Sequence, residues 1–110
     1  MKQPPAYLMF DDGDGLYNYC PSPVRVDETT MYVFYCANTI PGIVIDDIYA
    51  RKGTLTDGRW TFGEKFRVLQ PDRLGWDCIH VCDPDVIRGE FRYRGETYSW
   101  MMVYLGCDIH

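Results

Sequence analysis

Two similar stretches, CPSPV at residues 20–24 and CDPDVI at residues 82–87, decide the fold predicted from this sequence. After an intervening turn region, each is followed by a run rich in aromatic and apolar residues, YVFYC at 32–36 and WMMVY at 100–104. Proline at the start of a run and apolar residues after it are typical of β-strands joined in hairpins. We therefore expect two related β units along the chain.

The composition also favours a β fold. The 110 residues include 39 Val, Ile, Thr, Tyr, Phe and Trp but only nine Ala and Leu. β-Branched and aromatic side chains fit a pleated sheet better than a helix. Ten Gly and seven Pro are spread along the chain, as expected for turns between short strands. No stretch has the length and the 3.6-residue period of a helix, so the predicted class is all-β.

The expected strands follow from apolar runs bounded by turn residues. In the first half of the chain they cover residues 24–26, 31–37, 43–50 and 61–69, with Asp46 and Asp47 inside the third and a loop at 52–60. In the second half they cover residues 85–87, 91–94 and 98–105, with turns through Gly89 and at 95–96.

The spacing between the two units suggests a repeat. Pro21 and Pro84 are 63 residues apart, and Tyr35 and Tyr104 are 69 apart. This period suits a four-stranded β-propeller blade with its connecting loops. The alternative is a chance similarity in a chain with nine tyrosines. We predict an N-terminal segment at 1–16, a first blade at 17–71 and an incomplete second blade at 72–110.

These segments resemble the five-bladed β-propeller glycosidases, notably glycoside hydrolase family 43 and its arabinanase, β-xylosidase and levansucrase relatives. In that family a blade opens with an acidic-Pro or Ala-Pro-Asp tract at the propeller axis, turns at a Gly and returns as an aromatic strand. The tract DPDVI at 83–87, the turn at 94–96 and the run YSWMMVY at 98–104 follow that order. The resemblance spans residues 17–108 and implies two consecutive four-stranded antiparallel blades, part of a five-bladed propeller.

The resemblance implies three carboxylates around the axis: a base Asp, an orienting Asp that tunes the pKa of the acid, and an acid Glu, on three successive blades. Asp85 matches the orienting Asp, and Asp83 is the next candidate. The first-blade tract has no carboxylate at the matching position, so Asp12 or Asp14 would have to replace it. The acid Glu has no counterpart in residues 1–110. Because inverting hydrolysis needs both an acid and a base, we expect this chain to be inactive alone.

Each candidate site residue has a structural alternative. Asp83 and Asp85 are either a sugar-facing pair or turn carboxylates that accept backbone N–H groups. Trp76, Asp77 and His80 either bind a sugar, by aromatic stacking and hydrogen bonds to hydroxyls, or pack within the fold. Tyr19, with its neighbours at 17 and 18, has the same two interpretations.

We predict no metal site and no cofactor. Cys78, His80, Cys82 and Asp83 are chemically able to bind zinc, but structural sites need a second ligand pair that the sequence does not show. Their alternation is also typical of an ordinary strand. The acidic run at 11–15 lacks the remaining ligands of a calcium loop, so we expect a flexible acidic turn.

Charge and cysteine usage limit the partners and the location. The net charge of −5 and the pI of about 4.8 argue against binding to nucleic acid or to an anionic membrane surface. The apolar stretches are far shorter than the ~20 residues that span a bilayer. Five cysteines without framework spacing, and no apolar leader at residues 1–5, predict reduced thiols and a cytoplasmic protein.

Two functions fit these observations. The first is a carbohydrate-active, glycosidase-like propeller segment that lacks part of its catalytic set. The alternative is a non-catalytic sugar-binding or self-assembling β module. A carbohydrate is the expected ligand of the propeller segment and of a sugar-binding module. The lateral faces of two isolated blades predict self-association or union with the remaining blades of the propeller.

Overall fold

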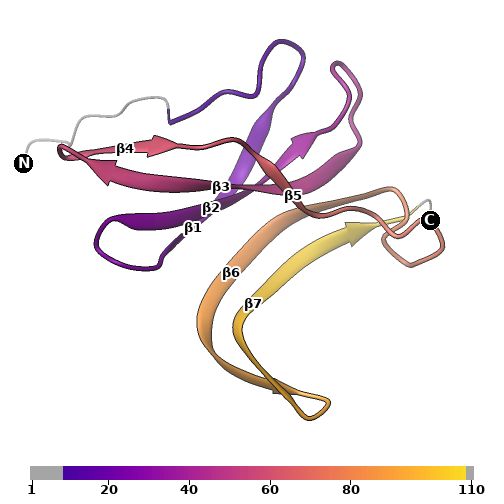
Figure 1. The fold of residues 1–110 in the computed structure, drawn as a ribbon. Coiled ribbons are helices and arrows are strands. Elements are labelled where there is room, and N and C mark those ends of the chain that lie inside the picture. The colour runs from indigo at the N-terminus through magenta and orange to yellow at the C-terminus, as the bar shows by residue number, and fades with distance from the viewer. Residues whose placement is uncertain (1–8, 109–110) are drawn as a thin grey trace, which may run out of the picture.

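The computed structural model describes residues 9–108, which form seven β-strands and no helix (Figure 1). The strands are β1 (Asn18–Arg25), β2 (Thr30–Asn38), β3 (Asp46–Thr56), β4 (Arg59–Phe62), β5 (Phe66–Leu69), β6 (His80–Tyr93) and β7 (Glu96–Cys107). The predicted all-β class is confirmed. No helix capable of crossing a membrane occurs within residues 9–108. The prediction of no leader at residues 1–5, and the outer parts of the segments 1–16 and 72–110, lie outside the described residues.

The first sheet contains β1 to β5, all antiparallel, in the order β1-β2-β3-β4, with β5 also paired to β3. β3 pairs with β2 along one edge. Along the opposite edge of β3, β4 pairs with residues 53–56 and β5 pairs with residues 48–50. The predicted loop at 52–60 is wrong, because Asp57 and Gly58 form a two-residue turn with φ of 53° and 75° that leaves both flanks free to pair. The predicted single strand at 61–69 is also wrong, because residues 63–65 interrupt it.

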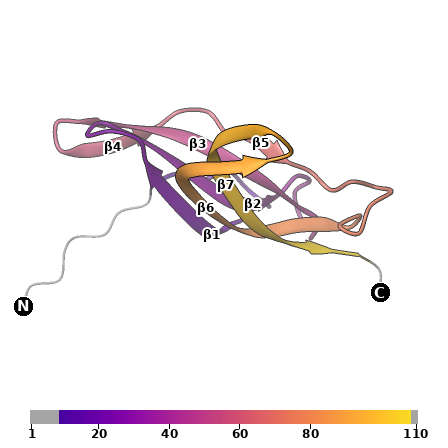
Figure 2. The same cartoon turned by 90° about the horizontal axis from the view of Figure 1, so that it is seen from below.

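The second sheet is the β6–β7 hairpin, which curls under the first sheet (Figures 1 and 2). Where three runs were predicted for this half of the chain, at 85–87, 91–94 and 98–105, the described residues form two strands, because β6 includes residues 85–87 and 91–93. The predicted turn through Gly89 is absent as well, since β6 passes this point with a register shift between Arg88 and Phe91 and remains one strand. Arg94 and Gly95, with φ of 49° and 78°, make the hairpin turn.

The first strand of each sheet carries the same backbone irregularity. In β1 the register shifts between Tyr19 and Ser22, and in β6 it shifts between Cys82 and Asp85. Each bulge contains one non-glycine residue in the left-handed region, Cys20 at φ 50° and Asp83 at φ 53°. Such residues are uncommon, and bulges bend a strand and redirect its side chains. These two positions are 63 residues apart, like the two prolines that follow them.

The first sheet packs on both of its faces. One face carries the core cluster of Val33, Tyr35, Ala37 and Tyr49, against which Phe10, Met31 and Phe62 pack. The other face meets the hairpin. There the backbone N–H of Val86 donates to Ser22 Oγ (3.0 Å), the N–H of Asp83 donates to Cys36 Sγ (2.8 Å), and the Trp100 ring packs edge-on against Tyr32. Burial on both faces of β2 explains its nearly continuous apolar sequence from Met31 to Ala37.

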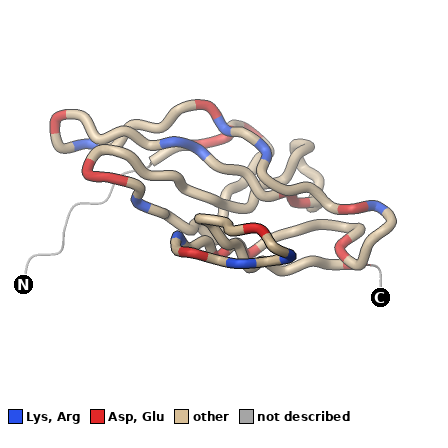
Figure 3. The backbone as a smooth tube through the Cα atoms, turned by 60° about the horizontal axis from the view of Figure 1, so that its bottom comes forward, with Lys and Arg blue, Asp and Glu red and all other residues tan. Residues whose placement is uncertain are grey.

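Charged residues are distributed over both sheets. Figure 3 shows Lys and Arg interspersed with Asp and Glu along the described backbone. The two polar clusters described below, around Asp12 and Asp46, differ from this pattern because their carboxylates are buried.

Candidate functional site

Five strand ends meet at one end of the molecule. β1, β3 and β6 begin there, and β2 and β7 end there, as the registers Asn38↔Asp46 and His80↔Cys107 require (Figure 1). This end gathers aromatic, acidic, imidazole and thiol side chains from segments far apart in the sequence. It also brings together two of the predicted site residues, Tyr19 and His80, around a carboxylate that was not predicted to function.

That carboxylate belongs to Asp46, which is 2% exposed at the first position of β3. The Tyr17 hydroxyl donates to Oδ1 at 2.5 Å, and the Tyr19 hydroxyl donates to Oδ2. His80 Nδ1 lies 3.4 Å from the same Oδ2. A buried carboxylate needs such partners to offset its lost hydration. The sequence signal for this site was an acidic pair inside an otherwise apolar strand.

Both tyrosines are held in the protonated form. Burial, and then the hydrogen bond to Asp46, raise the pKa of Tyr17 to about 12. The same causes raise the pKa of Tyr19 well above its ordinary value. The two phenols therefore act as hydrogen-bond donors at neutral pH, and the cluster presents a carboxylate with two neutral hydroxyls beside an imidazole.

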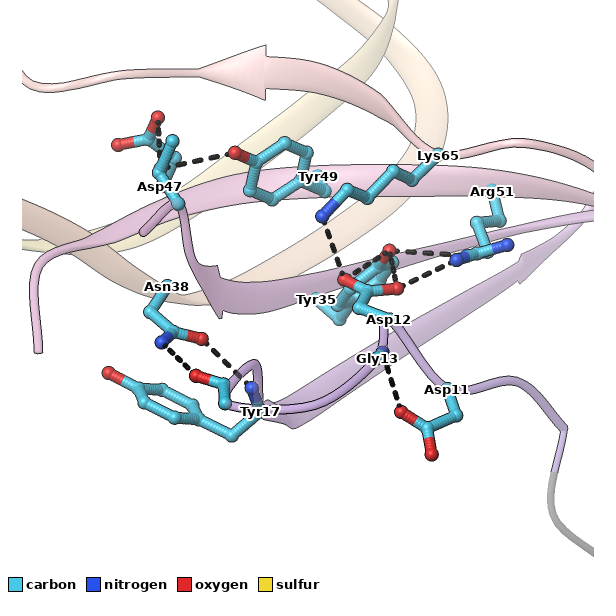
Figure 4. A network of polar contacts seen from close by, with 12 residues as sticks. Asp11, Asp12, Gly13, Tyr17, Tyr35, Asn38, Asp47, Tyr49, Arg51 and Lys65 are labelled. Carbon is cyan, nitrogen blue, oxygen red and sulfur yellow. Dashed lines mark hydrogen bonds and ion pairs between the residues drawn. The ribbon is translucent and has the colours of Figure 1, made fainter. Parts of the chain in front are cut away.

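Asn38 connects this cluster to the loop before β1. It is fully buried opposite Asp46, and its Oδ1 accepts the backbone N–H of Tyr17 at 2.8 Å (Figure 4). Its Nδ2 donates to the carbonyls of Gly15 (2.9 Å) and Ile40 (3.1 Å). One amide thus satisfies three backbone groups from two loops, which fixes the position of the Tyr17 ring.

Asp12 is the centre of a second polar cluster (Figure 4). Its side chain is 0% exposed, with Arg51 Nη2 2.7 Å from Oδ1 and Lys65 Nζ 3.2 Å from Oδ2. The Tyr35 hydroxyl donates to the same carboxylate at 3.2 Å. The expected flexible turn is therefore wrong for Asp12, although Asp11 accepts the N–H of Gly13 in a local turn. Each of the two carboxylate oxygens of Asp12 is therefore occupied by a cationic partner inside the fold.

The two aspartates of the DPDVI tract, Asp83 and Asp85, are exposed. Within the described residues, no hydrogen bond or ion pair joins either carboxylate to the Asp46 cluster. The Cys20 thiol hydrogen-bonds to the Asp83 carboxylate, which raises the pKa of that thiol. Asp85 pairs with Val103 across the hairpin, and no hydrogen bond or ion pair within residues 9–108 holds its carboxylate. Neither aspartate accepts a backbone N–H in this part of the chain, so the interpretation as turn carboxylates is not supported.

Trp76 is 63% exposed and lies flat against Tyr104, with ring centroids 5.8 Å apart and an interplanar angle of 24°. The Tyr104 hydroxyl donates to Asp77 Oδ2 at 3.1 Å, and buried Asp77 also accepts the backbone N–H of Asp72. Gly106 is required here, because a Cβ at this position would lie 2.3 Å from the indole. Asp77 thus stabilises the loop between β5 and β6, and Trp76 in the same loop offers an aromatic surface to solvent.

His80, Cys82 and Cys107 form one group whose ligand atoms all lie within 4.8 Å of one another. The zinc ligands considered from the sequence included His80 and Cys82 but took Cys78 as the second thiol. The structure replaces it with Cys107, the cross-strand partner of His80. That pairing depends on the register of the β6–β7 hairpin and had no local sequence signal.

Comparison of the chain with protein-family models, with curated proteins and with solved structures finds no match in any of the three.

Proposed function

We propose that this chain is a segment of a glycosidase-like β-propeller that binds carbohydrate at the strand-end site. One observation carries the proposal: β1 and β6 have the same bulge, and the two strands bury opposite faces. Residues 63 apart have the same backbone irregularity but opposite burial. Ser22 is buried while Asp85 is exposed, and Val24 is buried while Ile87 is exposed.

This opposite burial is expected for successive copies in a stack. The first unit buries one face against the second, and the second unit buries its other face against the first. The uncovered face of the hairpin, which includes Ile87, Met101 and Val103, then corresponds to a face that is covered in the first unit. A further unit stacked there would continue the series, as blades do in a propeller.

The strand-end site has the chemistry that sugars require. Carboxylate and imidazole groups bind hydroxyls, and an exposed indole provides a flat apolar surface for the C–H face of a sugar ring. Trp76, His80 and Tyr19 would contribute to such a site, with Asp46 orienting the latter two. Asp85 lies further along β6, outside the Asp46 cluster, and as an exposed carboxylate without a partner among the described residues it is the one available for the orienting role that the family resemblance implies.

We propose that the segment is catalytically inactive alone. Inversion needs two carboxyl groups about 6.5 to 9.5 Å apart on opposite sides of the sugar. Asp12 is neutralised by Arg51 and Lys65, so it does not supply the missing base. General acid–base assistance contributes about 10²- to 10⁴-fold per group, so Asp85 without a partner acid and base would give little turnover.

A non-catalytic, self-assembling module is the second candidate. It is favoured by the exposed apolar residues of the hairpin, of which Val103 is 60% and Leu105 50% exposed, and by the outer edge of β7, which pairs with no other strand within residues 9–108. Edges and apolar faces of this kind associate with other strands. Association between copies of this chain would cover them without any carbohydrate.

A titration with pentose oligosaccharides, together with aryl glycoside assays, tests the proposal. We expect saturable binding that Trp76→Ala weakens about tenfold, equivalent to about 1.4 kcal/mol. Tyr93→Ala is the matched control, because Tyr93 is an equally exposed aromatic residue at the far end of the hairpin. No measurable binding of any sugar would overturn the proposal in favour of the assembly module. Turnover that Asp85→Asn abolishes would overturn the statement that the segment is inactive alone.

A further inference from the structure

The hairpin brings three metal-binding side chains to its open end. His80 begins β6, Cys82 follows two residues later, and Cys107 ends β7 directly opposite His80. The imidazole nitrogen and the two sulfur atoms that can act as ligands lie within 4.8 Å of one another. Cys82 is buried, and His80 and Cys107 are half-buried, so the three groups are shielded from bulk water without being closed off from it.

We propose that His80, Cys82 and Cys107 bind a zinc ion. Two thiolates and one imidazole form a donor set that zinc prefers in tetrahedral coordination, with bonds of about 2.3 Å to sulfur and about 2.0 Å to nitrogen. Those bond lengths place neighbouring ligand atoms roughly 3.5 to 4 Å apart, so small rotations of the cysteine side chains close the site. Three protein ligands leave the fourth position to a water molecule.

The His80 ring also lies beside a carboxylate. Its Nδ1 is buried, has no hydrogen bond within residues 9–108, and lies 3.4 Å from Asp46 Oδ2. An imidazole that binds zinc through Nε2 would keep Nδ1–H directed at this carboxylate. A carboxylate behind the histidine is the usual outer-shell arrangement of zinc sites, where it fixes the tautomer and strengthens the ligand. Asp46 is itself fixed by Tyr17 and Tyr19.

Charge and proton balance are consistent with a dication. Each thiol that binds the metal releases its proton to solvent, so Cys82 and Cys107 together offset the charge of Zn²⁺. No electron transfer is involved. The metal would join the first residues of β6 to the last residue of β7, which stabilises the hairpin where the first sheet contacts it. With Nε2 on the metal and Nδ1–H directed at Asp46, His80 would leave any sugar contacts of the strand-end site to Trp76 and Tyr19, so the zinc site can be tested apart from sugar binding.

Cobalt(II) titration of the reduced, metal-stripped full chain tests the zinc site. We expect one Co²⁺ per chain, with thiolate-to-cobalt charge-transfer absorption and the visible bands of a tetrahedral site, displaced by one equivalent of Zn²⁺. Cys107→Ser and His80→Gln each remove a ligand, so each should weaken Zn²⁺ binding by more than the roughly 10- to 100-fold that loss of an outer-shell partner costs. Cys78→Ser and Cys20→Ser are the matched controls and should leave the titration unchanged.

Two results would overturn the zinc site. One is the absence of charge-transfer absorption in the wild-type chain, and the other is a Cys107→Ser titration equal to that of the wild type. Circular dichroism of each metal-free variant separates lost binding from lost folding. Should Cys82→Ser fail to fold because Cys82 is buried, the half-buried Cys107 still decides the outcome. A Cys82–Cys107 disulfide that persists under reducing conditions, detected by mass spectrometry, would also refute the proposal.

Discussion

Asp12→Asn removes the negative charge that Arg51 and Lys65 share, while keeping the size and shape of the side chain. In the wild type, Oδ1 lies 2.7 Å from Arg51 and Oδ2 lies 3.2 Å from Lys65. The new amide can still accept from Arg51 through its oxygen. Its NH₂ group, however, would face the Lys65 ammonium, and two donors cannot bond to each other.

The size of the loss follows from the burial of the three groups. Removing one member of a fully buried ion pair costs about 3 to 5 kcal/mol, because the remaining charge is left uncompensated. Here the Asp12 side chain is fully buried, but Arg51 is 15% and Lys65 is 29% exposed, so both cations can recruit water. Arg51 also keeps its bond to the Gly63 carbonyl at 3.0 Å. We therefore expect a loss in the free energy of unfolding of about 3 kcal/mol, at the lower end of that range.

Urea unfolding followed by tryptophan fluorescence measures this loss. With a slope of about 1 to 3 kcal/mol/M for a small domain, a loss of about 3 kcal/mol lowers the midpoint by roughly 1 to 3 M. Asp11→Asn is the matched control, since Asp11 is exposed and its replacement keeps the oxygen that accepts the Gly13 N–H. That control should remain within about 0.5 kcal/mol of the wild type.

An Asp12→Asn variant within about 0.5 kcal/mol of the wild type would refute the reasoning. It would mean that hydration of Arg51 and Lys65 offsets the lost ion pairs completely. A double-mutant cycle with Lys65→Met identifies the partner, because residues in one network show coupling of about 0.5 to 3 kcal/mol.

Three further predictions concern packing, pH and association. Gly106→Ala should destabilise the chain by about 1 to 3 kcal/mol in urea unfolding, because the new methyl group would overlap the Trp76 ring. In the metal-free chain, stability should fall as pH rises from about 9 towards 12 in unfolding series, because burial raises the pKa of the Cys82 thiol to about 11 and that of Cys36 to about 12. The unfolded thiols ionise near 9.0, so the stability that the two thiols contribute is complete below that pH and is lost as the pH passes their folded pKa values. Val103→Lys should shift the chain from self-associated species to monomer in size-exclusion chromatography with light scattering, since it places a charge on the exposed apolar face.

Each of these predictions has a matched comparison. Gly63→Ala adds the same methyl group with only a backbone oxygen at 3.8 Å, so equal losses at both glycines would argue against a steric cause. Cys82→Ala should flatten the alkaline fall in stability, and an unchanged pH profile would show that other groups cause it. Val44→Lys charges a residue that is 70% exposed in a loop, and it should leave the association unchanged. A wild-type chain that is monomeric at all concentrations would contradict the predicted self-association.

Local pattern was sufficient for the strands that contain a long apolar and aromatic run. The runs predicted at 31–37 and 98–105 lie inside β2 and β7, because apolar and β-branched residues favour a pleated, packed surface. Pattern failed where pairing overrides composition. Residues 52–56 contain Lys and Gly, yet they extend β3 because residues 59–62 pair with them across the Asp57–Gly58 turn.

The candidate site was predictable only where its residues carry local signals. Tyr19 and His80 were predicted as site residues from their position just before the CPSPV and CDPDVI tracts, and the structure places both against one carboxylate. Asp46 was visible only as an acid in an apolar strand. Cys107 gave no signal, because its partnership with His80 comes from the register of the hairpin.

The sequence by itself determined the all-β class and the 63-residue spacing of the two bulged tracts, because strand periodicity, turn residues and prolines act over a few neighbouring positions. Only the tertiary structure decided which polar groups are buried together. Asp12 and Arg51 are 39 residues apart, and Tyr17 and Asp46 are 29 apart. The physical reason is that a buried charge is stable only beside its partners, and strand pairing selects those partners across distances that no local pattern records.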